Sequence, residues 1–294
     1  MKKRHLLLLG TMLLASVAFS QQTPITESYF VNKYALSPSY AGNSENGYLF
    51  ASYLQYWSGI SDAPHTLRLS YHQGFKEKKV GLGANIIMDK AGAFQTFYGK
   101  ATYSYRLPLN TDEEILFGIS AGIISSSVNF NQFMSDPVYN SDPSLKANDF
   151  TSKPKFVSDI SGVYVLKNFQ FGVLLSNINF GKNYANESLA QYSPFLIYQF
   201  HAFYTVSIND QWQMKSLAIF RAGKYMRNQF EIGAQMKYND LFWGTFAFRG
   251  ENVFSAGFGI NVNKSLLINY SYNFNVGNNF NAMAIHEFTL GVKL

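Results

Sequence analysis

Residues 253–275 read VFSAGFGINVNKSLLINYSYNFN, and this stretch decides the fold class. On both sides of Asn263–Lys264, apolar or aromatic side chains alternate with small or amide side chains. This alternation predicts two antiparallel strands joined by a short turn. A soluble sandwich would place charge on its outer face, but here the polar face is Gly, Ser and Asn. That combination is typical of a barrel with lipid outside and a lumen inside.

The start of the chain has the pattern of a secretory signal peptide, residues 1–20. A basic start (Lys2, Lys3, Arg4) precedes the apolar run Leu6–Phe19, and cleavage is expected before Gln21. The run is short for a membrane-spanning helix, so an N-terminal anchor is the weaker alternative.

Composition narrows the class of protein. The 294 residues include 27 Phe, 20 Tyr and no Cys, which excludes disulfides and lipoprotein processing. The signal segment holds three of the 24 Lys and Arg and none of the 18 Asp and Glu, so the remainder carries +3. This charge gives no argument for a nucleic-acid partner. An exported, aromatic-rich chain with no apolar run long enough for a spanning helix is expected to be an outer-membrane barrel. A secreted soluble β-protein is the alternative.

The rest of the chain divides into a periplasmic lead-in or plug segment, residues 21–46, which is expected to narrow the lumen, and a transmembrane β-barrel, residues 47–294. The lead-in has no sustained alternation. The barrel region contains about 14 strand candidates: 47–57, 66–74, 80–88, 95–107, 115–125, 156–166, 169–177, 197–208, 212–220, 228–238, 241–249, 253–262, 265–275 and 285–294. The predicted fold is an all-β, transmembrane antiparallel β-barrel closed by pairing the first strand with the last.

The connections support this count. Every second connection is short, and the others tend to be longer, with 126–155 and 178–196 the longest. Bacterial outer-membrane barrels combine short periplasmic turns with longer external loops and an even number of strands. Both termini are therefore expected in the periplasm.

Charge assigns the two faces of the strands, because Lys or Arg facing lipid at mid-depth costs ~2–4 kcal/mol. The residues expected to face inward are Glu231, Gln235, Asn269 and Glu287. The residues expected to face lipid are Phe230, Ile232, Phe254, Phe258, Ile268 and Tyr270. Ile124 and Leu174 also fall on the inward face, which hints at a filled lumen. The phase of Trp212–Phe220 is ambiguous.

No motif predicts catalysis, a cofactor or a metal site. Beyond the signal segment, His65, His72, His201 and His286 lie on separate strands or loops, without metal-ligand spacing. No motif marks a nucleophile, so an enzyme is not expected.

Several short motifs resemble one family. Residues 37–42, SPSYAG, are similar to the N-P-A-Y-A-G signature of the PorP/SprF family of type IX secretion membrane proteins. Ser37, Ser39 and Asp62 depart from the family pattern. Residues 80–83, VGLG, with Asp89 and Gly92, resemble a further family stretch. The residues that carry the resemblance and form the candidate site are Pro38, Tyr40, Ala41, Gly42, Trp57, Gly59, Asp62, Pro64, His286 and Glu287.

The resemblance implies an outer-membrane accessory of the type IX secretion and gliding motility machinery. Its implied partners are a secreted adhesin or that adhesin's C-terminal domain, periplasmic type IX components and outer-membrane lipid. A porin or small-solute channel is the alternative. The motif at residues 38–42 either binds a partner or only fixes a bend, since Pro and Gly are also turn-forming residues. The lead-in is expected in the periplasmic mouth or against a partner, and the connection 126–155 is expected to face the adhesin.

Overall fold

The computed structural model describes residues 25–57, 63–77, 79–129, 150–179, 195–224, 226–250, 252–276 and 284–294. The expected signal peptide lies outside these residues. The strands are β1 Tyr48–Tyr56, β2 His65–Phe75, β3 Val80–Ala91, β4 Phe94–Pro108, β5 Glu113–Val128, β6 Phe150–Thr151, β7 Lys155–Leu166, β8 Phe169–Asn179, β9 Ile197–Ser207, β10 Trp212–Gly223, β11 Met226–Tyr238, β12 Phe242–Arg249, β13 Val253–Asn261, β14 Leu266–Asn275 and β15 Ile285–Lys293.

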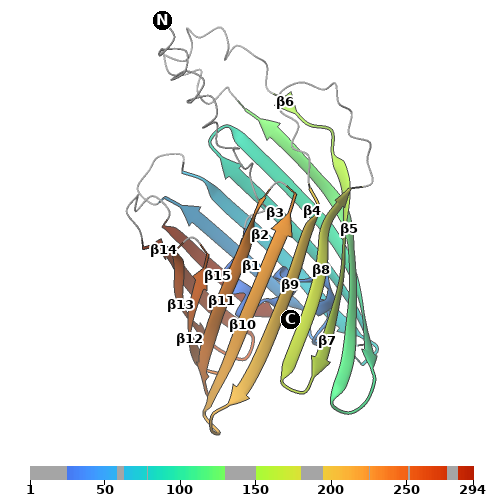
Figure 1. Ribbon diagram of the computed structural model, residues 1–294, viewed down its shortest axis with the longest axis vertical. Helices are drawn as coiled ribbons and strands as arrows, with labels where there is room; N and C mark the ends of the chain where they lie inside the picture. The colour runs from blue at the N-terminus through green and yellow to red at the C-terminus, as the bar shows by residue number, and fades with distance from the viewer. Residues whose placement is uncertain are drawn as a thin grey trace, which may run out of the picture.

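All strands except β6 form one closed antiparallel barrel (Figure 1). Neighbours in the chain pair in order, except that β6 pairs only with Ser127 and Val128 at the end of β5, and β7 pairs with the preceding part of β5. The ring closes between β1 and β15, where Tyr48 pairs with Lys293 and Tyr56 with Ile285. Closure leaves no unpaired sheet edge, which hydrocarbon would penalise by several kcal/mol for each unpaired group. The predicted 14-strand barrel and its closure are confirmed.

The two ends of the barrel differ in their connections. The short-turn end holds the connections after β2, β4, β7, β9, β11 and β13, several of which lie along the lower edge of Figure 1. The loop end holds the others, including those after β5 and β8. Some connections at the loop end are tighter than expected, at residues 92–93 and 224–225, because β3 and β10 continue beyond their predicted ends. Tyr48 and Lys293 both lie at the short-turn end.

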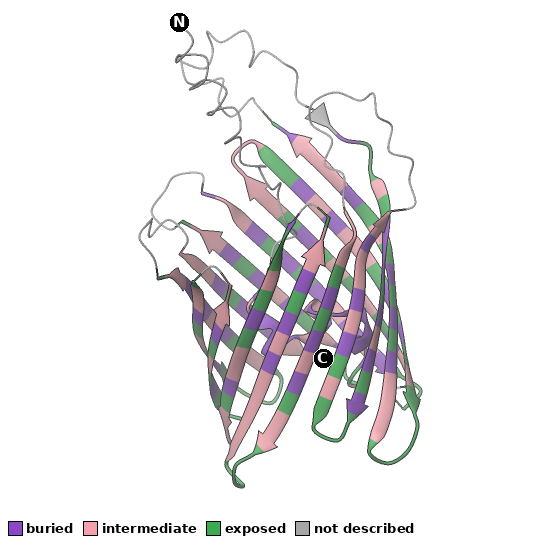
Figure 2. Ribbon diagram, viewed as in Figure 1, coloured by how far each residue is buried: buried purple, intermediate pink, exposed green. Residues whose placement is uncertain are grey.

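Burial alternates along the strands and separates the two faces (Figure 2). The four side chains expected to face inward are buried, with Glu287 1% and Glu231 3% exposed. Phe258 is 63% exposed and Ile232 45%, consistent with a surface covered by lipid. The predicted register of these strands is confirmed, and so are the inward positions of Ile124 and Leu174.

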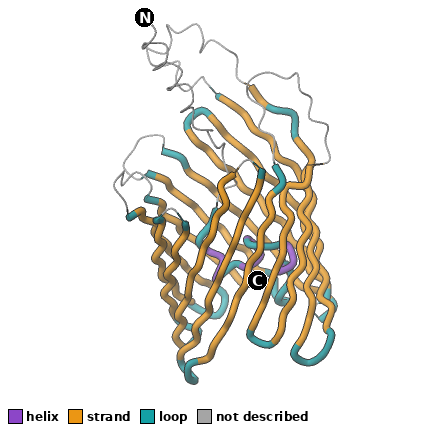
Figure 3. The backbone as a smooth tube through the Cα atoms, viewed as in Figure 1, coloured by secondary structure: helices purple, strands orange, loops and turns teal. Residues whose placement is uncertain are grey.

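The described part of the lead-in forms three short 3-10 turns, Ser28–Phe30, Lys33–Ala35 and Pro38–Tyr40. Figure 3 shows these turns inside the ring of strands. No helix among the described residues is long and apolar enough to cross a membrane.

Candidate functional site: the occupied lumen

The lead-in runs lengthwise through the barrel. Thr26 and Ser28 donate hydrogen bonds to Glu287, near the loop end of β15. Gly42 donates its N–H to His72, near the short-turn end of β2. The lead-in therefore lies within the lumen. This position agrees with the expected plug that narrows the lumen. The expected place in the periplasmic mouth or against a partner is corrected, because the lumen wall itself supplies the lead-in's binding groups.

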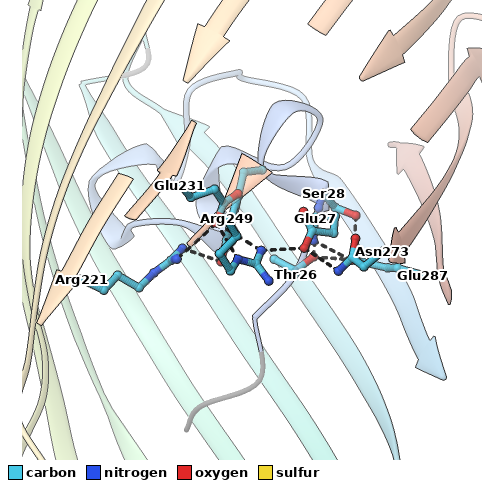
Figure 4. Close-up of polar contacts among 9 residues, drawn as sticks. Thr26, Glu27, Ser28, Arg221, Glu231, Arg249, Asn273 and Glu287 are labelled. Carbon is cyan, nitrogen blue, oxygen red and sulfur yellow. Dashed lines mark hydrogen bonds and ion pairs between the residues drawn. The ribbon is translucent and has the colours of Figure 1, made fainter. Parts of the chain in front are cut away.

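A buried network of charges holds the first turn of the lead-in (Figure 4). The Glu27 carboxylate lies 2.6 Å from Nη2 of Arg249 on β12. The same Arg249 group lies 3.1 Å from Oε2 of Glu231 on β11, which in turn lies 3.4 Å from Nη1 of Arg221 on β10. Arg221 also donates to the Tyr29 hydroxyl at 2.9 Å. Two carboxylates and two guanidinium groups thus balance each other, as burial of charge requires.

Glu287 receives three neutral donors from the same turn. Its carboxylate accepts from the Thr26 hydroxyl, from the Glu27 N–H at 2.6 Å and from the Ser28 hydroxyl at 2.8 Å. The Ser28 hydroxyl also pairs with Thr289 at 2.6 Å. A buried carboxylate with this many donors fixes the position of the lead-in along the barrel axis, next to β15.

The Pro38–Tyr40 turn presses against the opposite wall. The Ser39 N–H and hydroxyl both bond the Ser161 hydroxyl, at 3.1 and 2.6 Å. The Tyr40 hydroxyl lies 3.2 Å from Nε2 of His201, and the Tyr40 ring meets Phe203 edge-on at 6.2 Å. Pro38 occupies the first position of this turn, where its missing N–H costs nothing.

Gly42 makes the bend from which the chain continues to β1. Its φ is +70°, a region in which glycine alone is unstrained. A Cβ atom here would lie 2.4 Å from Cα of Gly81, so the lead-in backbone and the wall of β3 touch directly. The Ala41 carbonyl accepts from the Ser104 hydroxyl at 2.7 Å. Residues 41 and 42 are therefore small because two backbones meet.

An apolar core fills the space between the lead-in and one side of the barrel. It consists of Tyr29, Phe30, Leu36 and Tyr40 from the lead-in, together with Leu116, Val163, Val165, Phe203, Leu217 and Ile219 from β5, β7, β9 and β10. Leu217 and Ile219 point inward, which explains the ambiguous phase of β10. Apolar residues occupy both faces of that strand because the lead-in, rather than water, covers the inner one.

Lys33 is the one basic residue of the described lead-in. Its ammonium group donates to Gln170 at 2.7 Å and lies 4.4 Å from the centre of the Phe203 ring. Burial, with a smaller contribution from the charge of Lys215, lowers the pKa of Lys33 to about 7.

The other predicted site residues are divided by the structure. Trp57 and Pro64 lie at the loop end, where the Trp57 N–H donates to Ala284 and the Pro64 carbonyl accepts from Tyr56. His286 bonds the Tyr270 hydroxyl at 2.8 Å on the outer face, while its neighbour Glu287 faces the lumen. Gly59 and Asp62 lie outside the described residues. Pro38, Tyr40, Ala41, Gly42 and Glu287 thus bind the lead-in inside the barrel, and the remaining described ones do not.

Sequence reasoning missed Glu27, Arg221 and Arg249. The available signal was that Glu27 is the single acidic residue in residues 21–44, while Arg221 and Arg249 lie near the ends of two strands of a wall poor in charge. The described residues contain no group of three or more His, Asp or Glu side chains placed to hold a metal.

This architecture defines a transmembrane β-barrel of the outer-membrane type whose lumen holds its own N-terminal segment. The sequence family described as type IX secretion system membrane protein PorP/SprF matches residues 18–292. The chain therefore belongs to the PorP/SprF family, and family and fold together support an outer-membrane location. No curated protein matches the chain at a significant level.

Solved structures with a similar fold are outer-membrane barrels. The Ralstonia pickettii toluene transporter TbuX has a TM-score of 0.51 at 9% identity, covering 92% of this chain and 93% of its own. The CymD monoaromatic hydrocarbon channel gives 0.51 at 11%, covering 91% of each. Omp33 of Acinetobacter baumannii gives 0.50 at 6%, covering 85% of this chain and 100% of its own. At these identities the likeness shows the fold alone. Neither the family nor these neighbours are described as enzymes.

Proposed function

We propose that this protein is an accessory of the type IX secretion and gliding machinery that supports export or surface attachment of a large adhesin by binding other proteins. Family membership supplies the system. The observation that favours binding over conduction is the lead-in, seated in the lumen by the pairing of Glu27 with Arg249 and of Ser28 with Glu287. A barrel filled in this way presents two protein surfaces, one at each end, in place of an open pore.

The two ends then have separate partners. Short turns are typical of the periplasmic side of outer-membrane barrels and long connections of the external side. In our proposal the short-turn end, with Tyr48 and Lys293, faces periplasmic components. The loop end faces the adhesin or its C-terminal domain, with the connection 126–155 as the main contact. Residues 130–149 of that connection lie outside the described residues.

In this proposal the signature residues have two roles. Pro38, Tyr40, Ala41 and Gly42 seat the lead-in, while Trp57 and Pro64 border the connection after β1 at the loop end. Glu287 belongs to the first group. In this proposal the motif first packs the lead-in inside the barrel. The packed lead-in then holds in place the surfaces that bind partners.

Deletion of residues 21–36 tests the proposal. The variant should still form a heat-modifiable barrel, because every pair of the closed ring remains. Surface display of the adhesin, measured by antibody labelling of whole cells, should be lost. A matched control is Lys76→Gln, an exposed change at the short-turn end, outside the deleted residues. Normal display by the deletion variant would show that the lead-in only fills space.

A small-solute channel is the second candidate. A cavity of about 920 Å³ remains between the lead-in and the short-turn end, lined on the wall by Trp243, Gln235 and Phe50. Structures of the same fold include the channel for monoaromatic hydrocarbons and the toluene transporter. Uptake of a labelled aromatic solute by cells, compared with cells lacking the protein, would favour this reading if uptake depended on the protein.

A further inference from the structure

The cavity at the short-turn end is lined by several lysines, and packing of the lead-in does not account for them. Its ceiling is the underside of the lead-in, at Phe30, Val31 and Lys33, and its walls are β10 to β15 and β1. The turns after β11 and β13 surround its mouth. The charged residues of this lining are five lysines, Lys33, Lys215, Lys237, Lys264 and Lys293, and one carboxylate, that of Asp240.

The lysines are largely without protein partners. Lys237 pairs with Asp240 at 2.5 Å, and Lys33 donates to Gln170. Within the described part of the chain, no hydrogen bond or ion pair engages the ammonium groups of Lys215, Lys264 and Lys293. In a water-filled recess with walls of low dielectric constant, cations arranged in this way attract and concentrate anions.

The distance between the lysines indicates what kind of anion could bind them together. Lys237 lies on β11 and Lys293 on β15, so four strand spacings, about 19 Å along the wall, separate them. One small ion cannot reach both positions. An extended peptide covers that distance with about six residues.

The remaining lining suits a peptide as well. Gln235 and Asn239 line the same cavity, and their amide side chains pair readily with backbone N–H and C=O groups. Apolar side chains of Phe50, Trp243 and Leu267 line the same cavity. We propose that this cavity binds an extended acidic peptide segment, with carboxylates at the lysines and apolar residues between them. The inference deepens the proposed function, on which it rests for its setting, since it gives the chemistry of a partner at the short-turn end.

Direct binding tests this inference apart from adhesin display. The purified full chain in nanodiscs is titrated with a fluorescent peptide of alternating Glu and Leu residues, and with a Lys and Leu peptide of equal length. The acidic peptide should bind and the basic one should not. The Lys215→Gln/Lys264→Gln variant should weaken binding roughly tenfold. Its matched control is Lys76→Gln/Lys79→Gln, which removes the same charge from exposed positions at the same end, outside the cavity lining.

Charge reversal adds a second readout. Lys215→Glu/Lys264→Glu should lose the acidic peptide and gain the basic one, while a heat-modifiable band shows that the barrel still folds. Equal weakening by the cavity and control variants would overturn the inference, because the effect would belong to the whole rim. Full competition by sodium sulfate, where sodium chloride of equal ionic strength fails, would also overturn it in favour of a small-anion site. Normal display by the variant lacking residues 21–36, with peptide binding by the full chain intact, would count against the proposed function alone.

Discussion

The Glu27 carboxylate and the Arg249 guanidinium lie 2.6 Å apart inside the barrel, although 222 residues separate them in the chain. This pair joins the lead-in to a wall that forms only when the sheet closes. Arg249 also holds Glu231, so a single guanidinium compensates carboxylates from two segments. The lead-in is therefore part of the folded barrel rather than a tail attached to it.

Replacing Arg249 with Met should destabilise the protein strongly, because it leaves Glu27 and Glu231 buried beside a single remaining guanidinium. Loss of one member of a buried ion pair costs about 3–5 kcal/mol. The free energy of unfolding in urea, measured in detergent, checks this. Lys167→Met is the matched control, since the exposed pair of Lys167 with Asp112 should contribute less than about 1 kcal/mol. Equal costs for the two variants would show that the buried network does not stabilise the fold.

Replacing Gly42 with Ala should loosen the lead-in, because it combines a strained φ with a clash against Gly81. The two effects together cost about 2–5 kcal/mol. Gly92→Ala separates them, since Gly92 has a φ of +58° and nothing within 4 Å of its added Cβ. Gly42→Ala should raise the rate at which protease cuts the lead-in, and Gly92→Ala should not. Similar cleavage rates in both variants would show that the contact between Gly42 and Gly81 does not hold the lead-in.

Burial of Lys33 should make the free energy of unfolding depend on pH. Its pKa is about 7 in the folded protein and near 10.4 when unfolded, so between these values the unfolded chain binds more protons. Stability should therefore rise from pH 7 towards pH 10 and change little below pH 7 on account of this group. Unfolding midpoints of the natural protein and of Lys33→Met, measured across this range, should differ most near pH 7. A difference that does not vary with pH would contradict the assigned burial.

The strands of the barrel could be predicted from sequence, because successive side chains face lipid and lumen in turn and therefore alternate between apolar and polar. At Phe230 and Glu231 this difference is unambiguous. It is weakest at Leu217 and Ile219, where the inner surface is as apolar as the outer one. These two residues are apolar because they pack against the lead-in. A local sequence pattern cannot predict contact with a segment that lies almost 200 residues away in the chain.

The site was predicted in part. The Pro38–Gly42 motif was predicted either to bind a partner or to fix a bend; residues Pro38–Tyr40 form a turn, and Gly42 has a φ of +70°. The partners of the bend, Ser161, His201 and Gly81, could not be deduced, because they follow from the closure of the ring and from the depth at which the lead-in lies. Glu287 was correctly assigned to the inner face, but its role required the position of Thr26 and Ser28.

The central claim is that the lead-in closes the lumen, and single-channel recording in planar bilayers tests it most directly. The intact protein should show no steady open-channel current, because the seated lead-in and its apolar core fill the middle of the barrel. The variant lacking residues 21–36 should conduct, since the same ring of strands would then enclose a lumen from which the first two turns of the lead-in, Ser28–Phe30 and Lys33–Ala35, are missing. Large, constant currents from the intact protein would contradict the account and favour a diffusion channel.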